Sequence, residues 1–204
     1  MKHSLFPTRI YQEKLQQKSL VALNNHLKKE ILQFRRIDGS GQKWSLKNYP
    51  GGYTSYGSIS ELHKISSTFE NLEKLIRKHV ISFSKSLEMD IRSSDLKISS
   101  LWMNVMPQNV SHTMHLHPLS VVSGTYYVQT PPGSSALKFE DPRLAQFMAS
   151  PPRKQNAKPM NQRFISVLPN AGELVLFESW TKHEVPPNGS KQDRISISFN
   201  YDWK

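Results

Sequence analysis

The second half of the chain, from Leu96 to Lys204, is a series of short β-rich runs, and this pattern constrains the fold most. The runs are rich in Val, Ile, Tyr and Phe, and Pro, Gly and Asn separate them. The clearest are LKISSLWMNVM, SVVSGTYYVQT, ALKFED, RFISVLP, GELVLFES and RISISFNYDW. Only DPRLAQFMA reads as a helical interruption. Such a series predicts a sandwich or a jelly-roll barrel.

The first 95 residues combine helical and loop signals. Apolar residues recur at helical spacing between Ile10 and Phe34 and again from Phe69 to Leu87, which predicts two amphipathic helices. The intervening residues 38–58 are dense in Gly and Ser and predict a loop with at most short strands.

A chain of 204 residues without an internal repeat predicts one domain. In that domain we expect residues 1–95 to form a helical and loop support region and residues 96–204 to form the jelly-roll core. The expected fold class is therefore mainly β, of the α+β type, with a barrel braced by N-terminal helices.

The composition excludes several kinds of chemistry. Without cysteine there is no disulfide framework, thiolate nucleophile, iron–sulfur cluster or Cys-type zinc site, so a metal would need His, Asp or Glu ligands. No run reaches the ~20 apolar residues of a membrane span, and the N-terminus lacks the apolar part of a secretory signal. We therefore expect a cytoplasmic protein that does not associate with membranes.

The chain is strongly basic, with a formal net charge of +11 and a pI near 9.8. This charge suits an anionic partner, but Lys and Arg are spread along the chain without a long basic block or a recognition motif. The distribution predicts a solvated basic surface, and nucleic-acid binding is not expected to be the main function.

The last β-rich run has two chemically different faces. In an extended strand alternate side chains share a face, so Ile195, Ile197, Phe199, Tyr201 and Trp203 lie on one side. Arg194, Ser196, Ser198 and Asn200 lie on the other. The polar face either meets solvent or lines a polar cavity inside a barrel, and the pattern alone leaves both open.

Three histidines near this polar face are candidate metal ligands. His115 and His117 are two residues apart, so on a strand both rings project from one face. His183 follows the buried run ELVLF, and Arg194 follows eleven residues later. A ferrous ion needs two or three N or O ligands on one face and open positions opposite them. Arg offers a planar fork to a carboxylate, which Ser196 could support with a hydrogen bond.

The order His-x-His, a histidine after a buried strand and then Arg-x-Ser resembles the 2-oxoglutarate- and Fe(II)-dependent oxygenases of the double-stranded β-helix (jelly-roll) fold. The stretches LWMNVM, HLHPLSVVSGTYYVQTP, LKFEDPR and GELVLFESWTKHEVPPN, followed by RISISFNYDW, are similar to a family of bacterial and phage oxygenases of this type. The resemblance covers residues 96–204 and extends more weakly to LFPTRIY and GGYTS.

The resemblance implies a role for each site residue. His115 would be the first Fe(II) ligand and His183 the distal one. His117 is expected to complete a catalytic centre of three histidines that holds the metal. Arg194 would bind the far carboxylate of the cosubstrate 2-oxoglutarate, with Ser196 beside it. Further expected contacts with the cosubstrate come from Tyr127 and Asn104.

His117 departs from the superfamily's usual pattern, in which this position carries Asp or Glu. Three arrangements stay open: a three-histidine site, a carboxylate ligand from Asp141 or Glu140, or a His117 that does not bind the metal. His112, three residues before His115, is expected to lie beside the ligands and not to be one.

The resemblance implies an enzyme that uses O2 to convert 2-oxoglutarate into succinate and carbon dioxide, and that hydroxylates an unidentified small-molecule or peptide substrate. Two alternatives are a cupin-like three-histidine metalloenzyme or dioxygenase that uses no oxo acid, and a non-catalytic jelly-roll binding module. The sequence specifies neither the substrate nor the oligomeric state.

Overall fold

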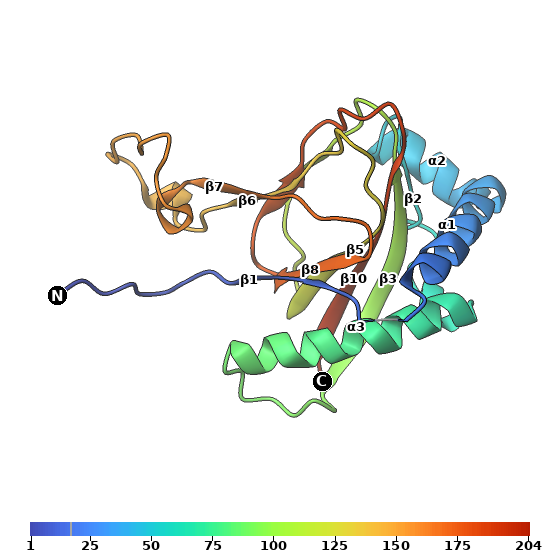
Figure 1. The fold of residues 1–204 in the computed structure, drawn as a ribbon, viewed down its shortest axis with the longest axis horizontal. Helices are drawn as coiled ribbons and strands as arrows, with labels where there is room; N and C mark the ends of the chain where they lie inside the picture. Colours follow the sequence, from blue (N-terminus) through green and yellow to red (C-terminus); the bar gives the residue numbers. More distant parts are fainter. Residues whose placement is uncertain (17) are drawn as a thin grey trace.

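Two antiparallel sheets face each other in the computed structural model, which describes residues 1–16 and 18–204 (Figure 1). The larger sheet has the order β1-β8-β5-β10-β3-β2. Its strands are β1 (Ile10–Lys14), β2 (Tyr53–Thr54), β3 (Leu96–Met106), β5 (Val122–Gln129), β8 (Glu173–Glu178) and β10 (Arg194–Trp203). The smaller sheet, β4-β9-β6-β7, consists of β4 (His112–His115), β6 (Leu137–Glu140), β7 (Phe164–Val167) and β9 (His183–Val185). The predicted mainly β fold of the second half is confirmed.

Helices from the first half of the chain support the larger sheet. They are α1 (Leu20–Ile37), α2 (Gly39–Asn48) and α3 (Ser67–Ser86), with a short 3-10 turn at Leu62–Lys64. Two further 3-10 turns, Leu144–Gln146 and Pro159–Asn161, lie between β6 and β7. One hydrophobic core joins α1 and α3 to the outward side chains of the larger sheet, among them Leu174, Ile197 and Phe199. Figure 1 shows α3 running below the sheet. None of the helices in the described part of the chain is both long and apolar enough to cross a membrane.

The prediction of one helix over residues 10–34 is wrong at its start. Ile10–Lys14 form strand β1, which pairs with β8, and α1 begins only at Leu20. Within the predicted range, Gln17 lies outside the described residues. The edge of β8 offers backbone partners to residues 10–14, and this tertiary pairing overrides their helical periodicity.

The prediction of a loop over residues 38–58 is also wrong in part, because Gly39–Asn48 form α2. The buried carboxylate of Asp38 caps this helix by accepting a hydrogen bond from Gly41 N at 2.8 Å. A β-carbon at Gly41 would lie 2.0 Å from Asp38 Oδ2, so only glycine allows this close approach. Gly41, which the sequence pattern assigned to a loop, therefore permits the N-cap of α2.

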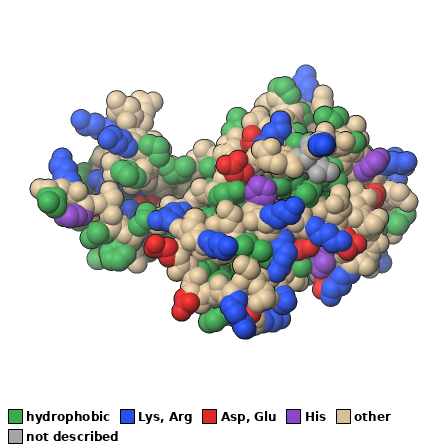
Figure 2. Space-filling model, turned by 60° about the horizontal axis from the view of Figure 1, so that its bottom comes forward, with side chains coloured by type: hydrophobic (Ala, Val, Ile, Leu, Met, Phe, Trp, Pro, Cys, Tyr) green, Lys and Arg blue, Asp and Glu red, His purple; other side chains and the backbone are tan. Residues whose placement is uncertain are grey.

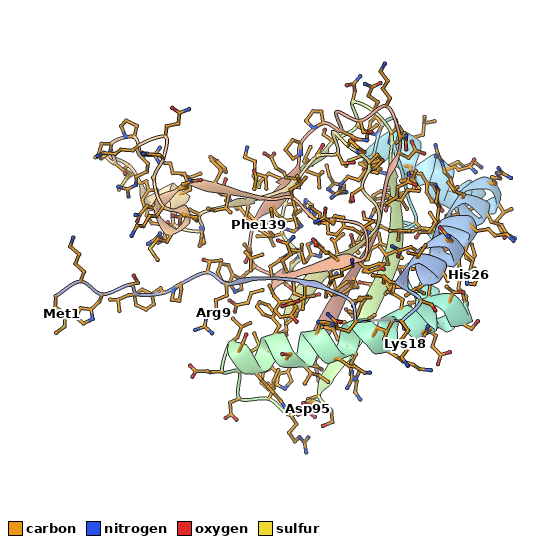
Figure 3. The ribbon with its side chains drawn as sticks, in the orientation of Figure 1. Met1, Arg9, Lys18, His26, Asp95 and Phe139 are labelled. Atoms are coloured by element: carbon orange, nitrogen blue, oxygen red, sulfur yellow. The ribbon has the colours of Figure 1, made fainter. Side chains whose placement is uncertain are left out.

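A second core lies between the two sheets. It contains Met106, Tyr127, Val175, Phe177 and Phe139, the last of which is labelled in Figure 3. Beyond β6 and β7 the chain projects from the barrel as an arm (Figure 1). A polar cavity lies beside this second core.

Candidate metal centre

Neighbouring strands of the smaller sheet bring the three predicted histidines together. His115 of β4 and His183 of β9 are direct register partners, and their ring centroids are 4.3 Å apart. His117 follows β4, and its backbone N–H donates to Ser179 O at 3.0 Å. The candidate ligand atoms of the three histidines all lie within 4.8 Å of one another. One cation could therefore contact all three.

Each of these histidines is oriented by a hydrogen bond from its Nδ1. The acceptors are Thr113 O for His115 (2.7 Å), Thr181 O for His183 (3.0 Å) and Asn200 Oδ1 for His117 (2.6 Å). Because carbonyl oxygens only accept, the hydrogen resides on Nδ1, and the lone pair of each Nε2 is free. Fixing the tautomer in this way is the usual preparation of a histidine for metal binding.

Burial keeps these imidazoles neutral at physiological pH. Loss of solvation lowers the pKa of His117 to about 4 and that of His183 to about 3, and it lowers the pKa of His115 as well. A neutral imidazole is the form that binds a metal. The donor set therefore fits a divalent ion such as Fe(II).

Arg194 is a buried cation at the start of β10. It is 3% exposed, and its guanidinium carbon lies 4.9 Å from the centroid of the Tyr127 ring. Among the described residues it makes no ion pair, and its Nε has no hydrogen-bond partner. A buried charge without a counter-ion is costly, so this position favours an anionic ligand.

A single cavity between the sheets joins Arg194 to the three histidines. Predicted residues Asn104 and Ser196 line it, and so do Thr125 and Ser198. The polar face of β10 therefore lines a cavity inside the barrel and does not face solvent, which were the two possibilities that its alternation left open. Tyr127 is fully buried and packs against Arg194, but it is not among the residues that line the cavity.

His112 lies in this cavity beside the candidate ligands, as expected. Its ring centroid is 4.5 Å from that of His115 and 5.2 Å from that of Tyr49. Regular strand geometry would point residues 112 and 115 to opposite faces, but the pairing of β4 with β9 shifts register between them. No pattern in the sequence predicted this irregularity.

Two further lining residues, Trp102 and Tyr49, were not predicted site residues. Trp102 shares one face of β3 with Asn104, so strand parity could have predicted its position. Tyr49 comes from the segment after α2, and no pattern connects it with the barrel.

The alternative carboxylate ligands lie elsewhere. Asp141 forms an ion pair with Arg143 at 2.9 Å, and Glu140 lies 3.5 Å from Lys182. The hydrogen bond from Arg143 lowers the pKa of the Asp141 carboxyl. Neither side chain is among those that line the cavity.

Comparisons with known proteins agree with this geometry. The sequence model of a family described as "Putative 2OG-Fe(II) oxygenase" matches residues 100–200. No curated protein matches the chain.

Several solved structures share the fold. A prolyl-4-hydroxylase from Pseudomonas putida has a TM-score of 0.62 and 18% identity, over 97% of this chain and 94% of that one. The α-ketoglutarate-dependent epimerase SnoN from nogalamycin biosynthesis has a TM-score of 0.66 and 12% identity, over 96% and 76%. HygX from Streptomyces hygroscopicus, with nickel and 2-oxoglutarate bound, has a TM-score of 0.62 and 11% identity, over 97% and 83%.

The two opposed sheets define a protein of the double-stranded β-helix fold, with three histidines that could hold a metal ion between them. Within that class, the chain belongs to the family of 2-oxoglutarate- and Fe(II)-dependent oxygenases. The predicted family, enzyme class and cofactors, Fe(II) and 2-oxoglutarate with O2, are confirmed at this level.

Proposed function

We propose that this oxygenase binds Fe(II) through the Nε2 atoms of His115, His117 and His183 and hydroxylates a substrate at the expense of 2-oxoglutarate. The observation that carries the proposal is the position of Arg194. This buried cation has no acidic partner among the described residues and shares one cavity with the three histidines.

The residues around Arg194 suit the binding of a dicarboxylic acid. The guanidinium group would hold the carboxylate of 2-oxoglutarate farthest from the metal, and the Ser196 hydroxyl, two residues along the same strand face, would add a hydrogen bond. The Tyr127 ring beneath the guanidinium would fix its orientation through a cation–π contact. Each group therefore acts by holding the acid in one position.

Asn104 is one of the residues that line the cavity. Its Nδ2 donates to the Ser198 hydroxyl at 3.1 Å, and its buried Oδ1 has no partner among the described residues. We propose that it contacts bound ligands, as its predicted role as a cosubstrate contact requires.

When bound, the iron supplies the redox chemistry in which 2-oxoglutarate and O2 give succinate, carbon dioxide and a hydroxylated product. The protein holds the imidazoles neutral through burial and their Nδ1 hydrogen bonds, and it binds the acid through Arg194. These residues orient the reactants.

We further propose that residues 1–204 form one domain, because α1 and α3 share a hydrophobic core with the larger sheet. A cytoplasmic location and a small-molecule or peptide substrate stay predictions from the sequence, as does the expectation that nucleic acid is not the partner.

Anaerobic titration tests the proposal. Metal-free protein is loaded with one equivalent of Fe(II), and 2-oxoglutarate is then added while the visible spectrum is recorded. We expect a metal-to-ligand charge-transfer band at saturation, and succinate after admission of O2. Metal binding without this band would favour the cupin-like alternative, and absence of metal binding would favour a non-catalytic binding module.

A further inference from the structure

The cavity contains no carboxylate of its own. Among the described residues, its lining includes three candidate metal ligands and His112 but no Asp or Glu, and Arg194 is its one charged side chain. This composition is unusual for the Fe(II) site of an oxygenase, because such sites commonly combine two histidines with one carboxylate. The inference drawn from it rests on the proposed function.

Four carboxylates that lie near the site residues in sequence have partners outside the cavity. Glu140 and Glu184 pair with lysines, and Asp141 pairs with Arg143. Asp202, two residues beyond Asn200, accepts a hydrogen bond from the Ser99 hydroxyl at 2.9 Å. None of these four residues lines the cavity.

The groups that accept hydrogen bonds from the three candidate metal ligands are neutral as well. Metal-binding histidines often donate their second N–H to a carboxylate, which makes the imidazole a more negative ligand. Here the three acceptors are two backbone carbonyls and the side-chain amide of Asn200. The ligands therefore gain no negative charge through their hydrogen bonds.

The charges of the loaded cavity then do not balance. Ferrous iron brings two positive charges and Arg194 brings one, whereas 2-oxoglutarate brings two negative charges. One positive charge is left in a cavity between two sheets, where solvent screens it poorly. Interaction with a further anion would offset this cost.

We propose that the substrate carries a carboxylate, which enters this cavity beside the metal centre and compensates the remaining positive charge. The hydroxyls of Thr125 and Ser198, which line the cavity, are donors suited to an oxygen anion. The basic surface acts in the same direction. Figure 2 shows Lys and Arg side chains spread over the face it displays, and a net charge of +11 draws anions toward the protein.

The test uses cobalt(II) as a spectroscopic substitute for iron. Protein with bound Co(II) and saturating 2-oxoglutarate is titrated with acetate, with its neutral isostere acetamide and with chloride, and the cobalt d–d spectrum reports binding. We expect a dissociation constant for acetate at least ~10-fold lower than that for acetamide or chloride. Equal affinities of acetate and acetamide, or no binding of acetate, would overturn the proposal. Chloride binding as tight as acetate binding would also overturn it, since the site would then take a free halide.

Two variants add the missing negative charge. His117→Asp replaces a neutral candidate ligand by a carboxylate, and Asn104→Asp places a carboxylate in the cavity wall without changing a histidine. In both, the preference for acetate over acetamide should fall to less than ~3-fold. An unchanged preference in Asn104→Asp would contradict the charge argument even if His117→Asp did not bind cobalt.

The same samples separate this proposal from the proposed function. Binding of 2-oxoglutarate to the cobalt protein is measured first, in the absence of acetate. Failure of that step would refute the proposed function. Binding of 2-oxoglutarate without a preference for acetate over acetamide would refute the substrate proposal alone.

Discussion

Asn200 controls which nitrogen of His117 faces the cavity. Its Oδ1 accepts hydrogen bonds from His117 Nδ1 at 2.6 Å and from the Ser123 hydroxyl at 2.7 Å. The Ser179 hydroxyl, 2.7 Å from that of Ser123, holds this small network in place. The orientation of His117 therefore depends on an amide that lies outside the set of candidate ligands.

Replacing Asn200 by leucine should lower the affinity for Co(II) or Fe(II) by about 10- to 100-fold, because His117 then loses the acceptor that fixes its tautomer. Calorimetric titration of the metal-free protein measures the affinity, and 15N NMR of the imidazoles reports the tautomer. Asn25→Leu, an exposed change on α1, is the matched control. Native metal affinity in Asn200→Leu would show that this hydrogen bond does not prepare the ligand.

Arg194 is expected to contribute to the binding of 2-oxoglutarate and not to the binding of the metal. Arg194→Ala should weaken 2-oxoglutarate binding by about 10- to 150-fold, the range expected for loss of a charge-assisted hydrogen bond of ~1.5–3 kcal/mol. Fe(II) affinity should change little. Equilibrium titration of both variants measures this, with Arg163→Ala in the projecting arm as the control. A similar loss of metal and 2-oxoglutarate binding in Arg194→Ala would contradict the separate roles.

At the scale of elements, Asp38 connects α1 and α2 to the segment that carries Tyr49. Besides capping α2, its carboxylate accepts hydrogen bonds from the hydroxyls of Tyr53 at 2.8 Å and Ser58 at 2.5 Å. Asp38 is thus a buried acceptor on which three donors depend.

Asp38→Ala should reduce the free energy of unfolding by about 3 kcal/mol, because it removes a helix cap and leaves buried donors without a partner. Urea unfolding followed by circular dichroism measures the loss. Asp90→Ala, at an exposed position after α3, should change it by less than ~0.5 kcal/mol. A loss below ~1 kcal/mol in Asp38→Ala would mean that the segment is held by other contacts.

Elements with strong alternation were predictable from the sequence, and short polar ones were not. The run predicted over residues 194–203 coincides with β10, and LKISSLWMNVM coincides with β3. In contrast, β4 and β9 have only four and three residues, and they contain histidine instead of an apolar pattern. Their pairing depends on contacts that are distant in sequence.

The candidate site shows the same division. The inward face of β10, with Arg194 and Ser196, follows from strand parity and could be predicted. The positions of His112 and Tyr49 depend on an irregular pairing and on a segment outside the barrel, so no local pattern could indicate them. The family resemblance supplied the grouping of His115 with His183, which parity alone cannot give.

For the molecule as a whole, the buried histidines make the stability of the metal-free protein dependent on pH. Burial lowers the pKa of His112 to about 4, that of His117 to about 4 and that of His183 to about 3. Since an unfolded histidine has a pKa near 6.5, the unfolded state binds more protons than the folded state below that pH. Their contribution is therefore lost as the pH falls from 6.5 toward 4.

The free energy of unfolding of the metal-free protein should accordingly fall by an amount on the order of 5 kcal/mol between pH 7 and pH 5, or about 2 kcal/mol for each of the three histidines. Urea unfolding at the two pH values measures the change. In His183→Gln the fall should be smaller by roughly 1 kcal/mol or more, whereas His26→Gln on the exposed face of α1 should leave it unchanged. Equal stability of the native chain at both pH values would contradict the burial of neutral imidazoles.

The central claim is that three histidines and one arginine form a single site for a metal and a dicarboxylic acid. A crystal structure with Fe(II) and 2-oxoglutarate, grown without O2, tests it most directly. We predict one metal ion at about 2.0–2.2 Å from Nε2 of His115, His117 and His183, and the far carboxylate of 2-oxoglutarate on Arg194. A metal that binds Asp141 in place of His117, or a 2-oxoglutarate that does not contact Arg194, would contradict this account.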